Sequence, residues 1–213
     1  YLAAWVVRRF LGPLGEAVAA SVLVVAYWWL MTAVPVPGFG PPNLMPETNL
    51  GAFLDRLLLS GHLWKQTKTW DPEGLLSTLP AIATTLLGSL VGHWIRSARS
   101  PKAKTVGLLG AGLALTAAGL AWGWVFPINK NLWTSSYVLF TAGMAAYHFG
   151  LVYYVVDVVG HQAWACPAVV YGRNAILVFV ASGLLAKTLY LIKLPSAAGT
   201  PLSLQAHLHR ALF

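Results

Sequence analysis

Long apolar runs, separated by short polar or proline-rich segments, dominate the sequence. Five of them are long enough to cross the roughly 30 Å hydrocarbon core of a bilayer as an α-helix, which rises about 1.5 Å per residue. They cover residues 14–34, 74–95, 103–126, 134–156 and 168–192. The pattern predicts an all-α fold, a polytopic transmembrane helix bundle with five complete spans.

The segments outside these runs predict smaller elements. Residues 1–10 (YLAAWVVRRF) are too short to span and are typical of the end of a helix that begins earlier. Prolines recur through residues 35–47. Because proline fixes φ and lacks an N–H, this stretch is irregular and must lie outside the hydrocarbon. Apolar side chains at helical spacing in residues 49–64 predict an interfacial helix within a loop of residues 35–73.

The chain is expected to form a single transmembrane domain, residues 1–213, that is incomplete at both ends. The tail of residues 203–213 (SLQAHLHRALF) either lies in the membrane interface or opens a further helix.

Charge is scarce and uneven along the chain. Only 9% of the residues are charged, against roughly 25% in an ordinary soluble domain, and 57% are hydrophobic. These numbers exclude a water-soluble globule and an intrinsically disordered chain. The net charge of +8 does not require a nucleic-acid partner, because the basic residues lie mostly beside membrane ends, where they orient a multispan protein.

The basic clusters predict the orientation. Arg8 and Arg9 precede the first span, and a second cluster occupies residues 96–104, two spans later, so both are expected to be cytoplasmic. The loop of residues 35–73 and the turn of residues 127–131 then share the extracytoplasmic side. The loop of residues 157–167 returns to the cytoplasm.

Small residues recur at four-residue steps in two spans. Thr84, Gly88 and Gly92 form one such stripe, and Gly119 and Gly123 form another. Small residues at this spacing let helix backbones approach closely, so both stripes are expected to be packing surfaces.

The sequence WDPEG places Asp71 and Glu73 immediately before the second span. One interpretation is a helix N-cap, in which Asp71 accepts backbone N–H bonds and Glu73 favours the positive end of the helix dipole. The other is a pair of carboxylates at the membrane surface that binds a cationic amine or takes a proton from it.

The sequence FPINKNLW joins the third and fourth spans and carries Asn129, Lys130, Asn131 and Trp133. It reads either as a tight turn with a snorkelling lysine and an interfacial tryptophan, or as a set of donors for a sugar hydroxyl, a carbonyl oxygen or a phosphate.

Polar residues on the opposite side predict an ion pair. Asp157 ends the fourth span, and Arg173 and Asn174 lie in the first turns of the fifth, so Asp157 and Arg173 are expected to pair across one loop. Asn174 and Ser182, two turns apart on one helical face, either line a polar passage or bond to a neighbouring helix.

No complete catalytic or metal-binding motif is present. His148 is the only histidine well inside a span, and no HExxH or His and Cys cluster accompanies it, so no metal site is expected. The single cysteine, Cys166, excludes a disulfide framework and a CxxC site.

Four segments resemble bacterial relatives of the heparan-α-glucosaminide N-acetyltransferase family. They are WDPEGLLSTLPAIATTLLGSLVG, FPINKNLWTSSYVLFTAG, VVDVVG and YGRNAILVFVASGLLAK. The resemblance implies a membrane acyltransferase, in the bacterial inner membrane, that moves an acetyl group from acetyl-CoA to the amine of a glucosamine-type sugar. It also implies that the catalytic histidine lies in a block before Tyr1 and that a last span follows Phe213, so this chain alone is expected to be inactive.

The resemblance implies roles for residues in these motifs. Asp71, Glu73 and Lys130 are the candidate catalytic residues. The candidate substrate-binding residues are Asn129, Asn131, Trp133, Asp157, Arg173 and Asn174. The expected partners are acetyl-CoA, an amino-sugar or glycan acceptor and the lipid bilayer, with a homo-oligomer left open, and Arg173 or the basic cluster of residues 96–104 would meet the CoA phosphates.

The alternative is a non-enzymatic membrane protein, either a transporter subunit or an assembly scaffold. A transporter should show inverted repeats and a helix broken in mid-span. Pro80 in the second span is one candidate kink, but no matching element is evident elsewhere in the sequence.

Overall fold

The computed structural model describes residues 2–195 and 201–212 of the chain. They divide into two compact units, Tyr1–Gly160 and His161–Phe213, which are described separately. Within the described residues, four helices are long and apolar enough to cross a membrane, and a bent pair of helices could form a fifth span. The predicted all-α, polytopic bundle is confirmed.

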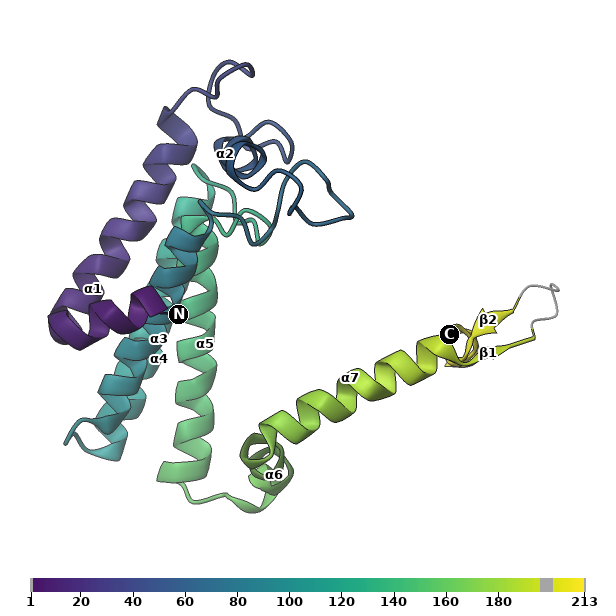
Figure 1. The fold of residues 1–213 in the computed structure, drawn as a ribbon. Coiled ribbons are helices and arrows are strands. Elements are labelled where there is room, and N and C mark those ends of the chain that lie inside the picture. The colour runs from purple at the N-terminus through teal and green to yellow at the C-terminus, as the bar shows by residue number, and fades with distance from the viewer. Residues whose placement is uncertain (1, 196–200, 213) are drawn as a thin grey trace. The chain divides into compact units, whose positions relative to one another are not determined.

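The first helix, α1 (Leu2–Ala33), is divided at Gly12. The backbone there has φ 61° and ψ −176°, a conformation that glycine adopts readily, and Pro13 follows. A short arm therefore precedes the long one, and Figure 1 shows it in deep purple at an angle to the rest of α1. This break separates the partial helix predicted over residues 1–10 from the span predicted over residues 14–34.

Three more long helices belong to the first unit, namely α3 (Thr78–Arg96), α4 (Pro101–Gly123) and α5 (Ser135–Tyr153). The last continues into the π-helical segment η1 (Tyr154–Val158). Their predicted positions are confirmed, although α3 begins four residues later than expected. At the start of α4, Ser100 caps the helix through Ala103 N, and Pro101 occupies the first turn, where no N–H is needed. Pro80 likewise lies in the first turn of α3, so the kink considered there is wrong.

Helices α4 and α5 pack closely through glycines. A Cβ placed on Gly119 would lie 2.5 Å from Phe140 N, and one placed on Gly143 would lie 2.4 Å from Thr116 N. The packing role predicted for Gly119 is therefore confirmed. Gly123 instead faces Ile128 in the loop that follows α4.

The packing role predicted for the stripe on α3 is wrong. A Cβ on Gly88 would meet nothing within 4 Å, and one on Gly92 would meet only the guanidinium of Arg96. The reason is that Thr84 and Gly88 line an apolar groove of about 780 Å³ between α3, α4 and α5 instead of contacting a neighbouring backbone.

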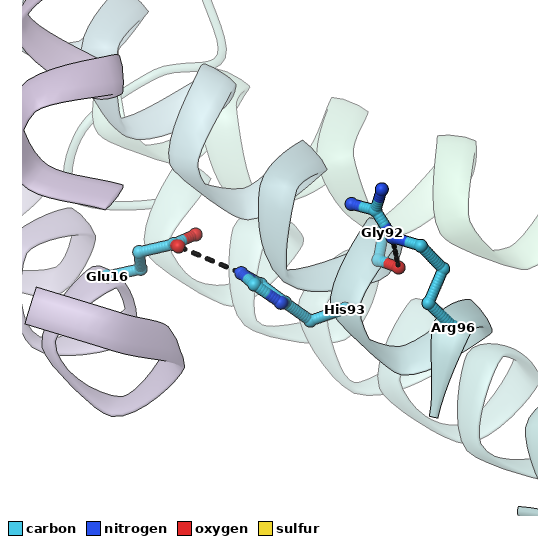
Figure 2. Close-up of polar contacts among 4 residues, drawn as sticks. All are labelled: Glu16, Gly92, His93 and Arg96. Atoms are coloured by element: carbon cyan, nitrogen blue, oxygen red, sulfur yellow. Dashed lines mark hydrogen bonds and ion pairs between the residues drawn. The ribbon is translucent and has the colours of Figure 1, made fainter. Parts of the chain in front are cut away.

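A polar pair, buried on its glutamate side and with the His93 side chain 33% exposed, links α1 to α3. Glu16 is 0% exposed, and its Oε1 lies 3.0 Å from Nε2 of His93, as Figure 2 shows. The second carboxylate oxygen, Oε2, has no hydrogen-bond partner among the described residues. One turn beyond His93, Arg96 Nε donates to the carbonyl oxygen of Gly92.

The second unit corrects the prediction of a continuous fifth span over residues 168–192. After the 3₁₀ turn η2 (Ala163–Ala165), α6 (Cys166–Arg173) and α7 (Ala175–Leu191) meet at an angle of 80°. Asn174 lies at the break with φ −115° and ψ 31°, and its Nδ2 donates to Val170 O at 2.8 Å. A side-chain amide that bonds the preceding turn competes with the helix backbone, which favours an end to the helix at this residue.

In the second unit, Ser182 donates to Phe179 O and Asn174 to Val170 O, both within four residues along the chain. Whether these side chains line a passage or face another helix stays a prediction. The unit ends with a two-stranded antiparallel sheet, β1 (Lys193–Leu194) and β2 (Leu202–Ser203), and the helix α8 (Leu204–Leu212). The tail is therefore helical, and its place, in the membrane interface or at the start of a further helix, stays a prediction.

The glycine contacts between α4 and α5 lead to the first prediction. Gly143→Ala should destabilise the protein by about 1–3 kcal/mol, because the new Cβ meets backbone atoms of α4 that cannot move aside cheaply. Gly88→Ala, which adds a methyl group in open space on α3, is the matched control. Thermal unfolding in detergent should show a lower Tm for Gly143→Ala alone, and equal Tm values would contradict the close packing.

The Glu16 and His93 pair leads to the second prediction. His93→Leu should cost about 3–5 kcal/mol, because it leaves a buried carboxylate with no partner for either oxygen. The double variant Glu16→Leu/His93→Leu should recover most of that loss, since two apolar side chains replace the whole pair. Unfolding of both variants tests this, and a double variant as unstable as His93→Leu would show that the pair does not act as a unit.

Candidate functional site

The two motif loops of the first unit lie at one end of its helix bundle. Figure 1 shows α2 and its flanking loops, in dark blue, beside the connection between α4 and α5. The helix α2 (Leu50–Leu58) ends six residues before the limit predicted from its apolar spacing. Asn49 caps it, with Oδ1 accepting from Ala52 N at 2.9 Å and Nδ2 donating to Met45 O at 2.7 Å.

Asp71 stabilises its own loop and does not cap α3. Its Oδ1 accepts from Glu73 N at 2.9 Å, and its Oδ2 accepts from Trp64 N at 3.1 Å. The N-cap of α3 is Ser77, so the predicted N-cap role of Asp71 is wrong. The reason is that residues 71–77 form turns before the helix starts, which moves the carboxylate away from the first helical N–H groups. Glu73 is exposed beside this turn.

The connection between α4 and α5 is a turn organised by Asn129. Its Oδ1 accepts from Asn131 N at 2.8 Å and from Leu132 N at 3.2 Å, which makes it a side-chain mimic of a backbone turn. The side chains of Lys130 and Asn131 are exposed. Trp133 donates its Nε1–H to Thr84 Oγ1 at 3.1 Å, so its indole is tied to α3.

Three hydroxyl residues that follow this turn anchor it to the bundle. Thr134, Ser135 and Ser136 are each 0% exposed. They donate to Pro127 O, Val24 O and Phe126 O, at 2.9, 2.6 and 2.5 Å. Their place after the turn was the only sign of them in the sequence, because buried and exposed hydroxyl residues look alike there.

Asp55 is another residue whose role the sequence did not reveal. It lies on α2, is 2% exposed, and accepts from Leu75 N at 2.9 Å through Oδ1. A Cβ on Gly74 would lie 2.2 Å from Asp55 Oδ2, so the carboxylate occupies the space that a side chain at position 74 would need. The glycine in WDPEG was the available sequence signal. A glycine without a positive φ indicates that another group, here the Asp55 carboxylate, occupies the space of the missing side chain.

Burial raises the pKa of the Asp55 carboxyl above its ordinary value, and the negative charge of Asp71 adds to the rise. Hydrogen bonds from the backbone of Leu75 and Asp71, together with the positive charge of Arg56, act in the opposite direction on this pKa.

The WDPEG and PINKN loops meet at a small cavity of about 20 Å³. Its lining includes Asp55 and Asp71 from one side and Asn131 and Leu132 from the other. Tyr27 of α1 closes it, and its hydroxyl donates to Leu132 O at 2.5 Å. The cavity has room for about one water molecule, so a sugar would have to bind outside it, on the exposed side chains of the two loops.

The remaining candidate residues lie elsewhere. Asp157 is exposed in η1, in the first unit, whereas Arg173 and Asn174 are exposed in the second unit. The predicted ion pair between Asp157 and Arg173 therefore stays a prediction. Among the residues that the structure describes, no group of three or more His, Cys, Asp or Glu side chains could hold a metal ion.

Comparison with known proteins gives two curated relatives. The human heparan-alpha-glucosaminide N-acetyltransferase is 32% identical over 197 residues, which covers 75% of this chain and 28% of the human protein. The mouse heparan-alpha-glucosaminide N-acetyltransferase is 31% identical over 193 residues, with 75% of this chain and 29% of the mouse protein covered. The chain thus spans less than a third of the length of these relatives. No family model matches it.

These similarities agree with the motifs quoted from the sequence, and the apolar helices agree with a bilayer setting. The chain is a relative of the heparan-alpha-glucosaminide N-acetyltransferase family, similar to less than a third of the length of these curated members, and an integral membrane protein.

Proposed function

We propose that this chain forms part of a membrane acyltransferase that moves an acetyl group from acetyl-CoA to the amine of a glucosamine-type sugar. The observation that carries the proposal is its 32% identity to the human N-acetyltransferase over 75% of the chain. The acceptor would bind where the WDPEG and PINKN loops meet. The setting would be a bacterial inner membrane.

The reaction defines what the site must supply. The amine arrives as an ammonium, so a base takes one proton from it before nitrogen attacks the thioester carbon. A carbon–nitrogen bond then forms, the carbon–sulfur bond breaks, and CoA leaves as a thiol with the second proton. Hydrogen-bond donors stabilise the oxygen that becomes negative in between.

The geometry divides the candidate residues into two groups. Asp71 and Asn129 already use their side-chain oxygens on backbone N–H groups, so we assign them to holding the loops. Glu73, Lys130 and Asn131 are exposed on the same two loops. We assign Glu73 to binding or deprotonating the amine, and Lys130 and Asn131 to the acyl or sugar oxygens.

The other candidates keep subsidiary roles in this proposal. Trp133, tied to Thr84, would support the loop from the membrane side. Asp157, Arg173 and Asn174 would act on the cytoplasmic side, where Arg173 or the basic residues between α3 and α4 would meet the CoA phosphates.

A transporter subunit remains the second candidate, because the 80° break between α6 and α7 is a discontinuous helix of the kind that transporters use. Acetyl transfer distinguishes the two functions. A transporter would move its solute without forming an amide and would consume no acetyl-CoA.

The third prediction tests the assignment of the exposed residues in the full-length protein, reconstituted in vesicles with acetyl-CoA and glucosamine. Glu73→Gln should lower kcat/KM by about 100-fold or more, the usual effect of losing a general base. Lys130→Ala should lower it less steeply, since Asn131 can still donate to the same oxygen.

Glu47→Gln and Lys65→Ala are the matched controls, because both residues are exposed in the same extracytoplasmic loop and neither belongs to the two motifs. They should keep the wild-type rate. Full activity in both Glu73→Gln and Lys130→Ala, with normal membrane insertion, would refute the proposed site.

A further inference from the structure

The helix α2 holds the WDPEG turn from both sides through two consecutive residues. Arg56 donates through one guanidinium nitrogen to Glu47 O at 2.6 Å and to Thr69 O at 2.9 Å. Its neighbour Asp55 accepts from Leu75 N at 2.9 Å. The segment from Thr69 to Leu75, which contains WDPEG, is therefore fastened to α2 at each end.

The contact between Asp55 and Gly74 leaves no room for a Cβ at position 74 unless the Asp55 carboxylate moves. A Cβ there would lie 2.2 Å from Oδ2 and 2.7 Å from both Cγ and Oδ1 of Asp55. The buried carboxylate thus determines how the turn before α3 is placed, and Glu73 is the residue directly before that contact.

Burying a carboxylate costs free energy, which is unusual for a group that only supports a turn. Burying it away from water disfavours its charged form, and Asp71 beside it adds repulsion. A neutral amide could accept the Leu75 N–H at lower cost, but its single oxygen cannot also accept from the backbone of Asp71 as the carboxylate does. Aspartate therefore holds the turn of residues 71–75 at both ends, which asparagine cannot do.

We propose that Asp55 is a positioning residue of the acceptor site, whose carboxylate holds the turn of residues 71–75 so that Glu73 faces the acceptor amine. This inference rests on the proposed function. Asp55 does not touch the acceptor itself, since it is buried beneath the turn.

The fourth prediction concerns Asp55→Asn. The value of kcat/KM should fall by up to about 100-fold, the cost of a misplaced catalytic group, with most of the loss in kcat. The Tm should not fall. Folding raises the pKa of Asp55, so the free energy of unfolding falls as pH rises from the pKa of the unfolded state to that of the folded state. Asparagine does not ionise and therefore removes this loss of stability.

The pH profile supplies a readout that a merely structural role would not move. In the wild type, activity should fall as pH drops through the raised pKa of Asp55, because protonation removes an acceptor from the turn. Asp71, Arg56 and Tyr27 are the other ionisable groups that interact with Asp55 electrostatically, and they are unchanged in the variant. The acid limb should therefore shift in Asp55→Asn.

A double-mutant cycle links the effect to the turn. Gly74→Ala should reproduce the kinetic loss, because its Cβ displaces the Asp55 carboxylate. The double variant Asp55→Asn/Gly74→Ala should lose no more than the worse single variant, since both changes disrupt one contact. Gly88→Ala and Glu47→Gln are the controls and should behave as the wild type.

Amide hydrogen exchange of residues 71–77 gives a readout independent of acetyl transfer, and it should accelerate about tenfold in Asp55→Asn. An active wild type with unchanged kcat, pH profile and exchange in Asp55→Asn would overturn the role of Asp55 alone. Additive losses in the double variant would also overturn it. A wild type without acetyl transfer would instead overturn the proposed function itself.

Discussion

The lack of water in a bilayer is the constraint on which the rest of this structure depends. Backbone and side-chain polar groups at membrane depth need partners within the protein, because hydrocarbon offers none. The described helices meet this need locally. Thr84, Thr116 and Thr141 each donate to a carbonyl oxygen four residues earlier, and Glu16 is paired with His93 across two helices. Charge is therefore rare in the spans and concentrated at their ends.

The same constraint explains how the loops at the end of the first unit are built. Turn residues there bind their polar groups to one another. The buried hydroxyls of Thr134, Ser135 and Ser136 tie them to the interior of α1 and to the segment that follows α4. The loops are also held by an apolar cluster, in which Val36, Leu50 and Phe126 are buried. A rigid frame of this kind can present a few exposed polar side chains in a fixed arrangement, which a binding site requires.

The sequence predicted the spans well because a long apolar run has few alternatives to a transmembrane helix. It predicted less of what depends on contacts between distant residues. The stripe at Thr84 and Gly88 has the spacing of a packing surface, yet no neighbouring helix approaches it. Asp71 has the position of an N-cap, yet it binds Trp64 and Glu73 instead. The break at Asn174 and the burial of Asp55 do not change the hydrophobic periodicity of the sequence, because each depends on a single residue.

Residue type alone therefore does not separate a functional carboxylate from a structural one in this chain. Glu16, Asp55, Asp71 and Glu73 are all acidic residues beside membrane ends, but their surroundings differ. The first three form their hydrogen bonds inside the protein. Glu16 bonds to His93, Asp55 to the backbone of Leu75, and Asp71 to the backbone of its own loop. Glu73 is exposed, so its carboxylate is available to a molecule from outside. A substrate amine can reach Glu73 without breaking a hydrogen bond within the protein. For this reason we prefer Glu73 over the buried acids as the group that meets the acceptor.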